Sequence, residues 1–291
     1  MPNYKTHSIH SELIYPYITK YTNIDKEKLK YFAIGPDTLI TSDYKIFETQ
    51  HKSNVKDFFI YLLKIIKDNN LQYNEEIMTY LYGQIDHYIL DIITHPMIYY
   101  YTSNYNSKYK FNTHGLVEHW LDDYVIKNYN NNINPNYTNK KIIDNKLANI
   151  IDKAYFNVYK ANSISLKYKI GLINTINYDN LIRKNPLYIL KPLLNITNIG
   201  DITYSKNPKR VLEFLNQSND IWYNPETNET YNYSFDELWK QSLATTIKTI
   251  DDINNYLYNE EPLNNYYINN NISYNTGLPC TIEQTLKYAK K

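Results

Sequence analysis

The stretch "YLYGQIDHYILDIITHPMIYYY", residues 80–101, is apolar enough to form a helix inside the protein. His87, Asp91 and His95 recur along it at intervals of four residues. Because an α-helix turns once per about 3.6 residues, this spacing places the three side chains on one face. Unpaired polar groups are costly to bury. A core helix with this polar row therefore needs partners for it elsewhere in the chain.

The composition is that of a globular protein with a sizeable core. The chain has 291 residues, of which 43% are hydrophobic, and its net charge is +1. This charge gives no support for a surface that binds polyanions. The chain has only 6 glycines, and no glycine-rich phosphate loop occurs. Cys280 is the single cysteine, which excludes an internal disulfide and a cysteine-based zinc site.

The chain shows neither a signal-peptide pattern in residues 1–17 nor an apolar run of about 18 residues. We therefore expect a protein of the cytoplasm without a transmembrane segment.

Helical periodicity dominates the chain and predicts an all-α fold. We expect one domain over residues 1–291, with a metal-ligand half at 1–127 and a helical half at 142–291. Residues 128–141 are expected to form a solvated loop, and 199–205 is the best of the weak β-like stretches. The expected helices are 9–21, 25–34, 53–68, 74–96, 114–129, 142–160, 208–216, 234–258 and 281–291. Pro96 is expected to end the fourth of them, and capping boxes open the last two.

All seven histidines lie within the first 119 residues, close to several carboxylates. Asp37 follows a Gly-Pro pair in "AIGPDTL", and His114 and Glu118 form a second pair four residues apart. Any one of these groups alone is explained equally well by ordinary hydrogen bonds. Taken together with His51 and the row in residues 80–101, they favour a zinc site, because zinc prefers imidazole nitrogen and carboxylate oxygen.

A carboxylate in the middle of such a row can join two metal ions. Asp91 has this position between His87 and His95. A bridged pair of ions generates a hydroxide near neutral pH and stabilises the oxygens of a phosphodiester during in-line attack. The pattern therefore indicates hydrolysis of a phosphodiester.

The order Asp-x13-His, His-x3-Asp-x3-His and His-x3-Glu resembles the zinc-dependent phospholipase C family, whose all-helical fold is shared with S1/P1-type nucleases. "THSIHSEL", "GPD" and "YLYGQIDHYILDIITHP" look like segments of its intracellular-type bacterial members, and "IWYNPETNETYNYSFDELWKQSL" (221–243) looks like the turn before the last long helix. The resemblance spans most of the chain. In the secreted members a processed N-terminal tryptophan ligates one zinc, whereas this chain begins with Met-Pro.

The resemblance implies a ligand set for two or three zinc ions. Asp37 is also implied as the possible general base. His10 competes with His7, which is favoured because it follows a threonine as in the family. The implied ligands are Asp37, His51, His87 and Asp91 for the first ion, His95, His114 and Glu118 for the second, and Asp91 with His7 for the third.

We therefore expect a zinc-dependent phosphodiester hydrolase that uses a zinc-bound hydroxide. The expected substrate is a phospholipid or another phosphodiester, with peripheral membrane contact. An S1/P1-type nuclease stays as an alternative, because such nucleases use the same metal set. The near-neutral charge makes nucleic acid the less favoured substrate. A non-catalytic helical protein stabilised by zinc is a second alternative. A phosphohydrolase of the His-Asp type ranks low, since the adjacent pair Asp86-His87 has the reverse order.

Overall fold

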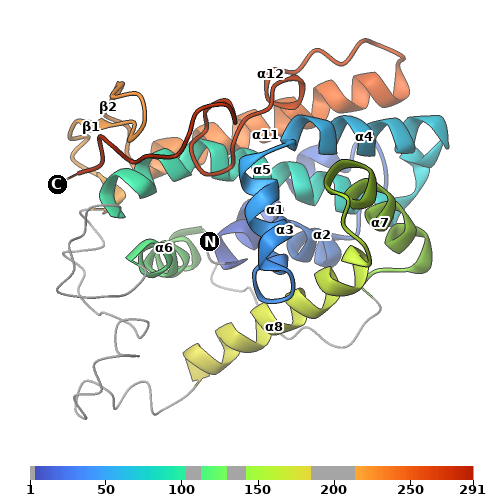
Figure 1. Cartoon of the computed structure of the whole chain (residues 1–291), viewed down its shortest axis with the longest axis horizontal. Helices are drawn as coiled ribbons and strands as arrows, with labels where there is room; N and C mark the ends of the chain where they lie inside the picture. Colours follow the sequence, from blue (N-terminus) through green and yellow to red (C-terminus); the bar gives the residue numbers. More distant parts are fainter. Residues whose placement is uncertain (1–3, 103–112, 130–141, 185–213, 291) are drawn as a thin grey trace.

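The computed structural model describes residues 4–102, 113–129, 142–184 and 214–290 (Figure 1). Helices dominate these residues, which confirms the expected all-α class. A two-residue antiparallel pair, β1 with β2, precedes the last long helix. The elements are α1 (Tyr4–Ile18), α2 (Lys26–Phe32), the 3-10 helix η1 (Gly35–Thr41), α3 (Tyr44–Lys52), α4 (Val55–Asp68), the 3-10 helix η2 (Leu71–Tyr73), α5 (Glu75–Thr102), α6 (Thr113–Tyr129), α7 (Asn145–Tyr159), α8 (Ile164–Lys184), β1 (Trp222–Tyr223), β2 (Thr230–Tyr231), α11 (Phe235–Tyr258) and α12 (Tyr266–Asn269).

Helix α5 lies at the centre of this arrangement. It is 28 residues long, and nearly all of its side chains are buried. Helices α1, α2, α6 and α11 all pack against it, as does η1 (Figure 1). The predicted core helix thus has several neighbouring elements that can supply partners for its polar row.

Pro96 does not end α5, so this expectation is wrong. The helix continues to Thr102. A proline inside a helix leaves the carbonyl four residues earlier without its helical donor, and here the backbone of Gly277 lies against that carbonyl, which belongs to Ile92. The residues after Pro96 are buried in a cluster that includes Met97 and Trp222. Packing of the last turn outweighs the local effect of the proline.

The helix expected at 281–291 is also wrong, since residues 281–290 form turns and bends. Three of their backbone donors bind the β1–β2 hairpin, among them the N–H of Tyr288, which donates to the Pro225 carbonyl. The Glu226 carboxylate accepts the N–H groups of Thr285 and Leu286, each at 2.8 Å. Leu286 has a φ of 54°, outside the helical region. The chain end is therefore attached to the β1–β2 hairpin as an irregular segment.

The other expected helices agree with the structure within a few residues wherever the structure describes them. The capping box of Ser234 and Glu237 is present at the start of α11. The sequence patterns do not predict α3, α8 or α12, nor the short 3-10 helices η1 and η2. The β-like stretch 199–205, residues 130–141 of the expected loop and most of the expected helix 208–216 lie outside the described residues. No helix in the described ranges combines the length and the apolar character needed to cross a membrane.

We expect Gly83→Ala to destabilise the protein, because α2 approaches α5 at this glycine. A Cβ there would lie 2.6 Å from the carbonyl carbon of Phe32. Overpacking of this kind costs about 1–3 kcal/mol, which exceeds the gain in helix propensity of about 1 kcal/mol. Urea denaturation measures the loss, with Asn149→Ala on the exposed side of α7 as control. A Gly83→Ala protein as stable as the wild type would contradict the close packing of α2 on α5.

Candidate metal centre

All eight side chains expected to bind metal come together around the polar row of α5. The structure describes every one of them, and seven are almost completely buried. His114 is the most exposed, with 15% of its side chain accessible. They come from five elements: His7 on α1, Asp37 on η1, His51 on α3, His87, Asp91 and His95 on α5, and His114 and Glu118 on α6.

Asp91 lies at the centre of the group. Its Oδ2 is 3.1 Å from Nε2 of His87, the residue one turn earlier on α5. Its Oδ1 is 3.4 Å from Nε2 of His7 and 3.5 Å from Nε2 of His95. The helical spacing seen in the sequence accounts for the contacts to His87 and His95, whereas His7 reaches Asp91 from α1.

Asp37 and His51 form a second part of the cluster beside His87. The Asp37 Oδ1 atom is 3.1 Å from His51 Nε2 and 3.8 Å from His87 Nε2. The Gly-Pro pair of the sequence starts η1 at this point. Gly35 has a φ of 59°, and a Cβ there would overlap the His87 ring. Glycine therefore allows the backbone of η1 to pass close to His87 and to place Asp37 next to it.

Helix α6 supplies the third part of the cluster. The Glu118 Oε1 atom lies 2.7 Å from His114 Nε2, one turn earlier on the same helix. The same oxygen lies 3.5 Å from His95 Nε2 on α5. The pair that the sequence places four residues apart thus meets the end of the α5 row.

Backbone carbonyls hold three of the imidazole rings through Nδ1. A carbonyl only accepts hydrogen bonds, so Nδ1 donates, and in the neutral ring Nε2 carries the lone pair that a metal binds. These three partners could not be predicted from the sequence. Every residue has a backbone carbonyl, so no residue type marks the ones that accept from a histidine. The pairs are His51 with Phe47 at 2.7 Å, His87 with Ala33 at 3.1 Å, and His95 with Tyr274 at 2.8 Å.

Several buried polar atoms of the cluster have no hydrogen-bond partner among the described residues. They include both ring nitrogens of His7, both carboxylate oxygens of Asp91, Oδ2 of Asp37, and Nε2 of His87 and His95. A buried polar group without a partner costs about 1–3 kcal/mol. Metal ions would satisfy these atoms, and imidazole nitrogens with carboxylate oxygens are a donor set that zinc accepts. The residues present therefore fit zinc.

Three groups within the cluster have ligand atoms that lie within 4.8 Å of one another: His7, His87 and Asp91; Asp37, His51 and His87; and His95, His114 and Glu118. His87 belongs to two of the groups, but its Nε2 has one lone pair and can bind one ion. A carboxylate has two oxygens. Asp91 therefore stays the candidate for the bridging ligand.

The structure places His7, and not His10, beside Asp91. The His10 ring points elsewhere, with Nδ1 2.6 Å from Asp86 Oδ1 and Nε2 2.8 Å from Ser242 Oγ. Its edge also packs against Trp239. Both ring nitrogens of His10 thus have partners away from the cluster.

The buried charges shift one another's pKa values. Burial alone would raise the pKa of Asp91, but His95 and His87 hold it well below its usual range. Asp37 likewise has a lowered pKa, because His87 and His51 outweigh its burial. Burial would lower the pKa of His87, yet Asp91 and Asp37 raise it to about 9. The carboxylates are therefore ionised at neutral pH, as metal ligands must be.

A family model described as zinc dependent phospholipase C matches residues 6–165, which is more than half of the chain. This chain belongs to the zinc-dependent phospholipase C family. The matched segment contains all eight side chains of the cluster. No curated protein and no solved structure matches the chain.

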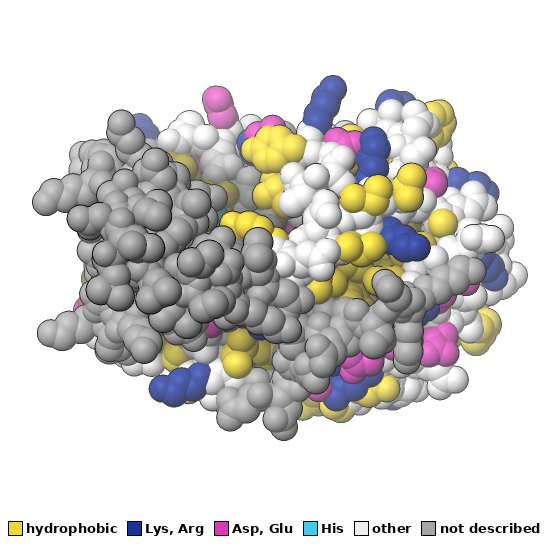
Figure 2. Space-filling model, turned by 90° about the horizontal axis from the view of Figure 1, so that it is seen from below, with side chains coloured by type: hydrophobic (Ala, Val, Ile, Leu, Met, Phe, Trp, Pro, Cys, Tyr) yellow, Lys and Arg dark blue, Asp and Glu magenta, His cyan; other side chains and the backbone are white. Residues whose placement is uncertain are grey.

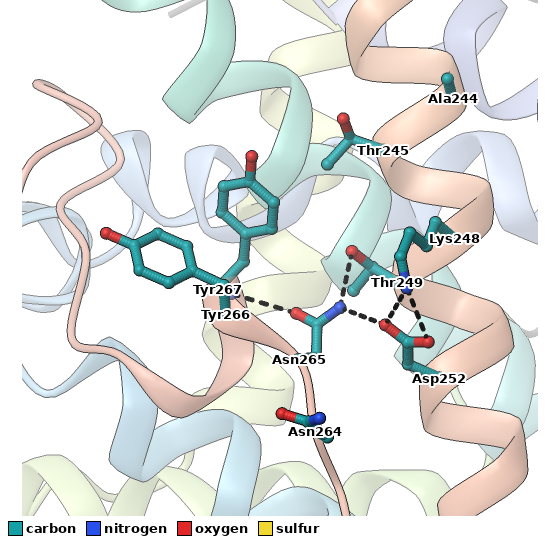
Figure 3. A pocket seen from close by; sticks show the side chains of 9 residues that line it. All are labelled: Ala244, Thr245, Lys248, Thr249, Asp252, Asn264, Asn265, Tyr266 and Tyr267. Atoms are coloured by element: carbon teal, nitrogen blue, oxygen red, sulfur yellow. Dashed lines mark hydrogen bonds and ion pairs between the residues drawn. The ribbon is translucent and has the colours of Figure 1, made fainter.

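A surface pocket of about 520 Å³ lies away from these residues, between α11 and α12 (Figure 3). Four of its polar side chains, those of Lys248, Thr249, Asp252 and Asn265, are paired with each other. The Asp252 carboxylate binds Lys248 at 3.0 Å and Asn265 Nδ2 at 2.9 Å. None of the eight cluster residues lines the pocket. In this phospholipase C family member the candidate metal ligands therefore lie in the buried cluster and not in this pocket.

We expect zinc to bind this family member more tightly as the pH rises from 6.5 to 9. Without metal, the raised pKa keeps His87 protonated up to about pH 9. Zinc takes the unprotonated ring, so binding releases this proton, and loss of the His87 proton raises the affinity by about tenfold per pH unit well below pH 9 and by less as the pH approaches 9. Competition with a chelator, corrected for the chelator's own protonation, measures the slope. An affinity that does not change over this range would contradict the charge assigned to His87.

Proposed function

We propose that the chain is a zinc-dependent phospholipase C that hydrolyses the phosphodiester of a phospholipid. The observation that carries this proposal is the buried Asp91 carboxylate, whose oxygens lie 3.1–3.5 Å from the Nε2 atoms of three histidines. The chain that contains it belongs to this family. Zinc ions held by these residues would supply positive charge for the phosphoryl oxygens and would lower the pKa of a water molecule, which favours its attack on phosphorus.

The eight cluster residues would have different roles, which follow from their charge and their position. Asp91 would join two ions, while Glu118 and Asp37 add negative charge at either end of the cluster. Asp37 is also the proposed general base. Its pKa is lowered by His87 and His51, and its Oδ2 has no hydrogen-bond partner among the described residues. An ionised carboxylate with a free oxygen can accept a proton from water.

The surface supports a phospholipid substrate over a nucleic acid. Figure 2 shows Lys and Arg side chains mixed with Asp and Glu among the described residues of one face, with hydrophobic side chains between them. A nucleic-acid surface would instead concentrate basic side chains. The net charge of +1 agrees with this.

Helix α8 supports the proposed peripheral contact with a lipid surface. Leu166, Ile170 and Ile173 recur on one side of α8, and between 42% and 59% of each residue is accessible. The same helix packs against η1, which carries Asp37. Exposed apolar side chains of this kind favour contact with lipid.

Zinc counting together with a substrate panel tests the proposal. We expect two or three zinc ions per purified chain, and hydrolysis of phosphatidylcholine or phosphatidylinositol vesicles. Single-stranded DNA and RNA should remain intact. One zinc ion or none, without hydrolysis, would favour the non-catalytic alternative, and cleavage of nucleic acid alone would favour a nuclease.

Asp91→Ala should lower phospholipid hydrolysis by more than about 100-fold and reduce the zinc content, because it removes the shared ligand. Lys248→Ala is the control, since it changes the surface pocket and leaves the cluster untouched. Its activity should equal that of the wild type. Full zinc content in Asp91→Ala would contradict the bridging role, and loss of activity in Lys248→Ala would move the site to the pocket.

A further inference from the structure

Helix α1 is hydrogen-bonded to α6 through Thr6, the residue immediately before His7. The N–H and the hydroxyl of Thr6 both donate to Oδ1 of Asp122 on α6, at 2.7 and 2.6 Å. Both residues are buried. Asp122 lies one turn after Glu118, so the anchor on α6 is close along the helix to the α6 part of the cluster.

Helix α1 is fastened again one turn later, at His10. Its Nδ1 lies 2.6 Å from Asp86 Oδ1 on α5, and its Nε2 lies 2.8 Å from Ser242 Oγ on α11. Asp86 directly precedes His87 in the sequence. The anchors on either side of His7 therefore involve three helices, two of which carry residues of the cluster.

The row Ser242, His10 and Asp86 has the residue types of a serine hydrolase triad, but its geometry excludes that role. All three residues have 0% accessible surface. The hydroxyl of Ser242 also donates to the Trp239 carbonyl at 2.8 Å, so it is engaged as a donor. A substrate cannot reach this serine, and the row serves to hold helices together.

His7 itself has no side-chain hydrogen bond among the described residues. Its ring stacks on His87 with centroids 4.1 Å apart, and its Nε2 lies 3.4 Å from Asp91. The ring position therefore depends on where α1 lies. A shift of α1 by one residue would move this side chain by about 1.5 Å along the axis and turn it by about 100°.

We propose that Thr6, His10, Asp86, Ser242 and Asp122 are positioning residues for one metal ion of the cluster. Their hydrogen bonds fix the rotation and height of α1 and bring His7 to the ion that it shares with Asp91. The other two groups contain no residue of α1, so their ions do not depend on these bonds. This inference rests on the proposed zinc centre and adds residues that bind no zinc themselves.

Zinc titration of two mild variants tests the inference. Thr6→Val removes the hydroxyl donor and keeps the side-chain shape, and Ser242→Ala removes the partner of His10. We expect each to weaken one zinc ion by about tenfold or more, as loss of supporting hydrogen bonds does, and to leave the other ions unchanged. Thr6→Ser should restore wild-type binding, because it keeps the hydroxyl.

Tyr82→Phe is the matched control. It removes a buried hydrogen bond of 2.6 Å between Tyr82 on α5 and Asn254 on α11. It should leave every zinc affinity unchanged. The inference is overturned if Thr6→Val binds all its zinc like the wild type, or if Tyr82→Phe weakens the same ion equally.

Histidine ring spectra of the metal-free protein, labelled with 15N, separate this inference from the proposed function. The ring signals of His7 should move in Thr6→Val and Ser242→Ala and stay in place in Tyr82→Phe. Unmoved His7 signals in the first two variants overturn the positioning role. A wild type that binds no zinc overturns the proposed function, and the spectra still decide the positioning role in that case.

Discussion

A carboxylate without any accessible surface, Asp91, lies among three imidazoles at the centre of the protein. A buried charge is stable only when opposite charges or metal ions surround it. The fold meets this requirement by placing α1, η1 and α6 around one face of α5. Each of these elements carries a residue of the cluster. The contacts that pack these elements against α5 therefore also bring the cluster residues together.

The centre could be anticipated from the sequence because helical periodicity is a local property. Residues four apart on α5 and α6 must share a face, and this brings His87, Asp91 and His95 into one row and Glu118 next to His114. The contact between α1 and α5 is not local. The choice between His7 and His10 therefore needed the structure, which turns His10 toward Asp86. The metal-binding role of these residues and the single-domain organisation stay predictions.

Tertiary contacts explain where the sequence-based prediction of the fold failed. Pro96 was expected to end α5, but the turn that follows is buried against the β1–β2 region. The segment 281–291 has a helical pattern, yet the Glu226 carboxylate accepts the backbone N–H groups of Thr285 and Leu286. Helix α8 exposes apolar side chains such as Leu166 and Ile170, so it lacks the clear amphipathic stripe by which a surface helix is recognised.

The arrangement of the cluster depends in part on the loop at residues 273–277, which is far from the cluster residues in the sequence. The Tyr274 carbonyl orients His95, and the N–H of the same residue donates to the His51 carbonyl at 3.0 Å. Gly277 lies against the carbonyl that Pro96 leaves free. All eight cluster residues fall within residues 6–165, but the carbonyl that orients the His95 ring and the N–H that binds the His51 backbone come from more than 100 residues later. A fragment cut at residue 165 would keep every candidate ligand but would lose the carbonyl that orients the His95 ring. The segment that carries the motif is therefore shorter than the segment that arranges its side chains.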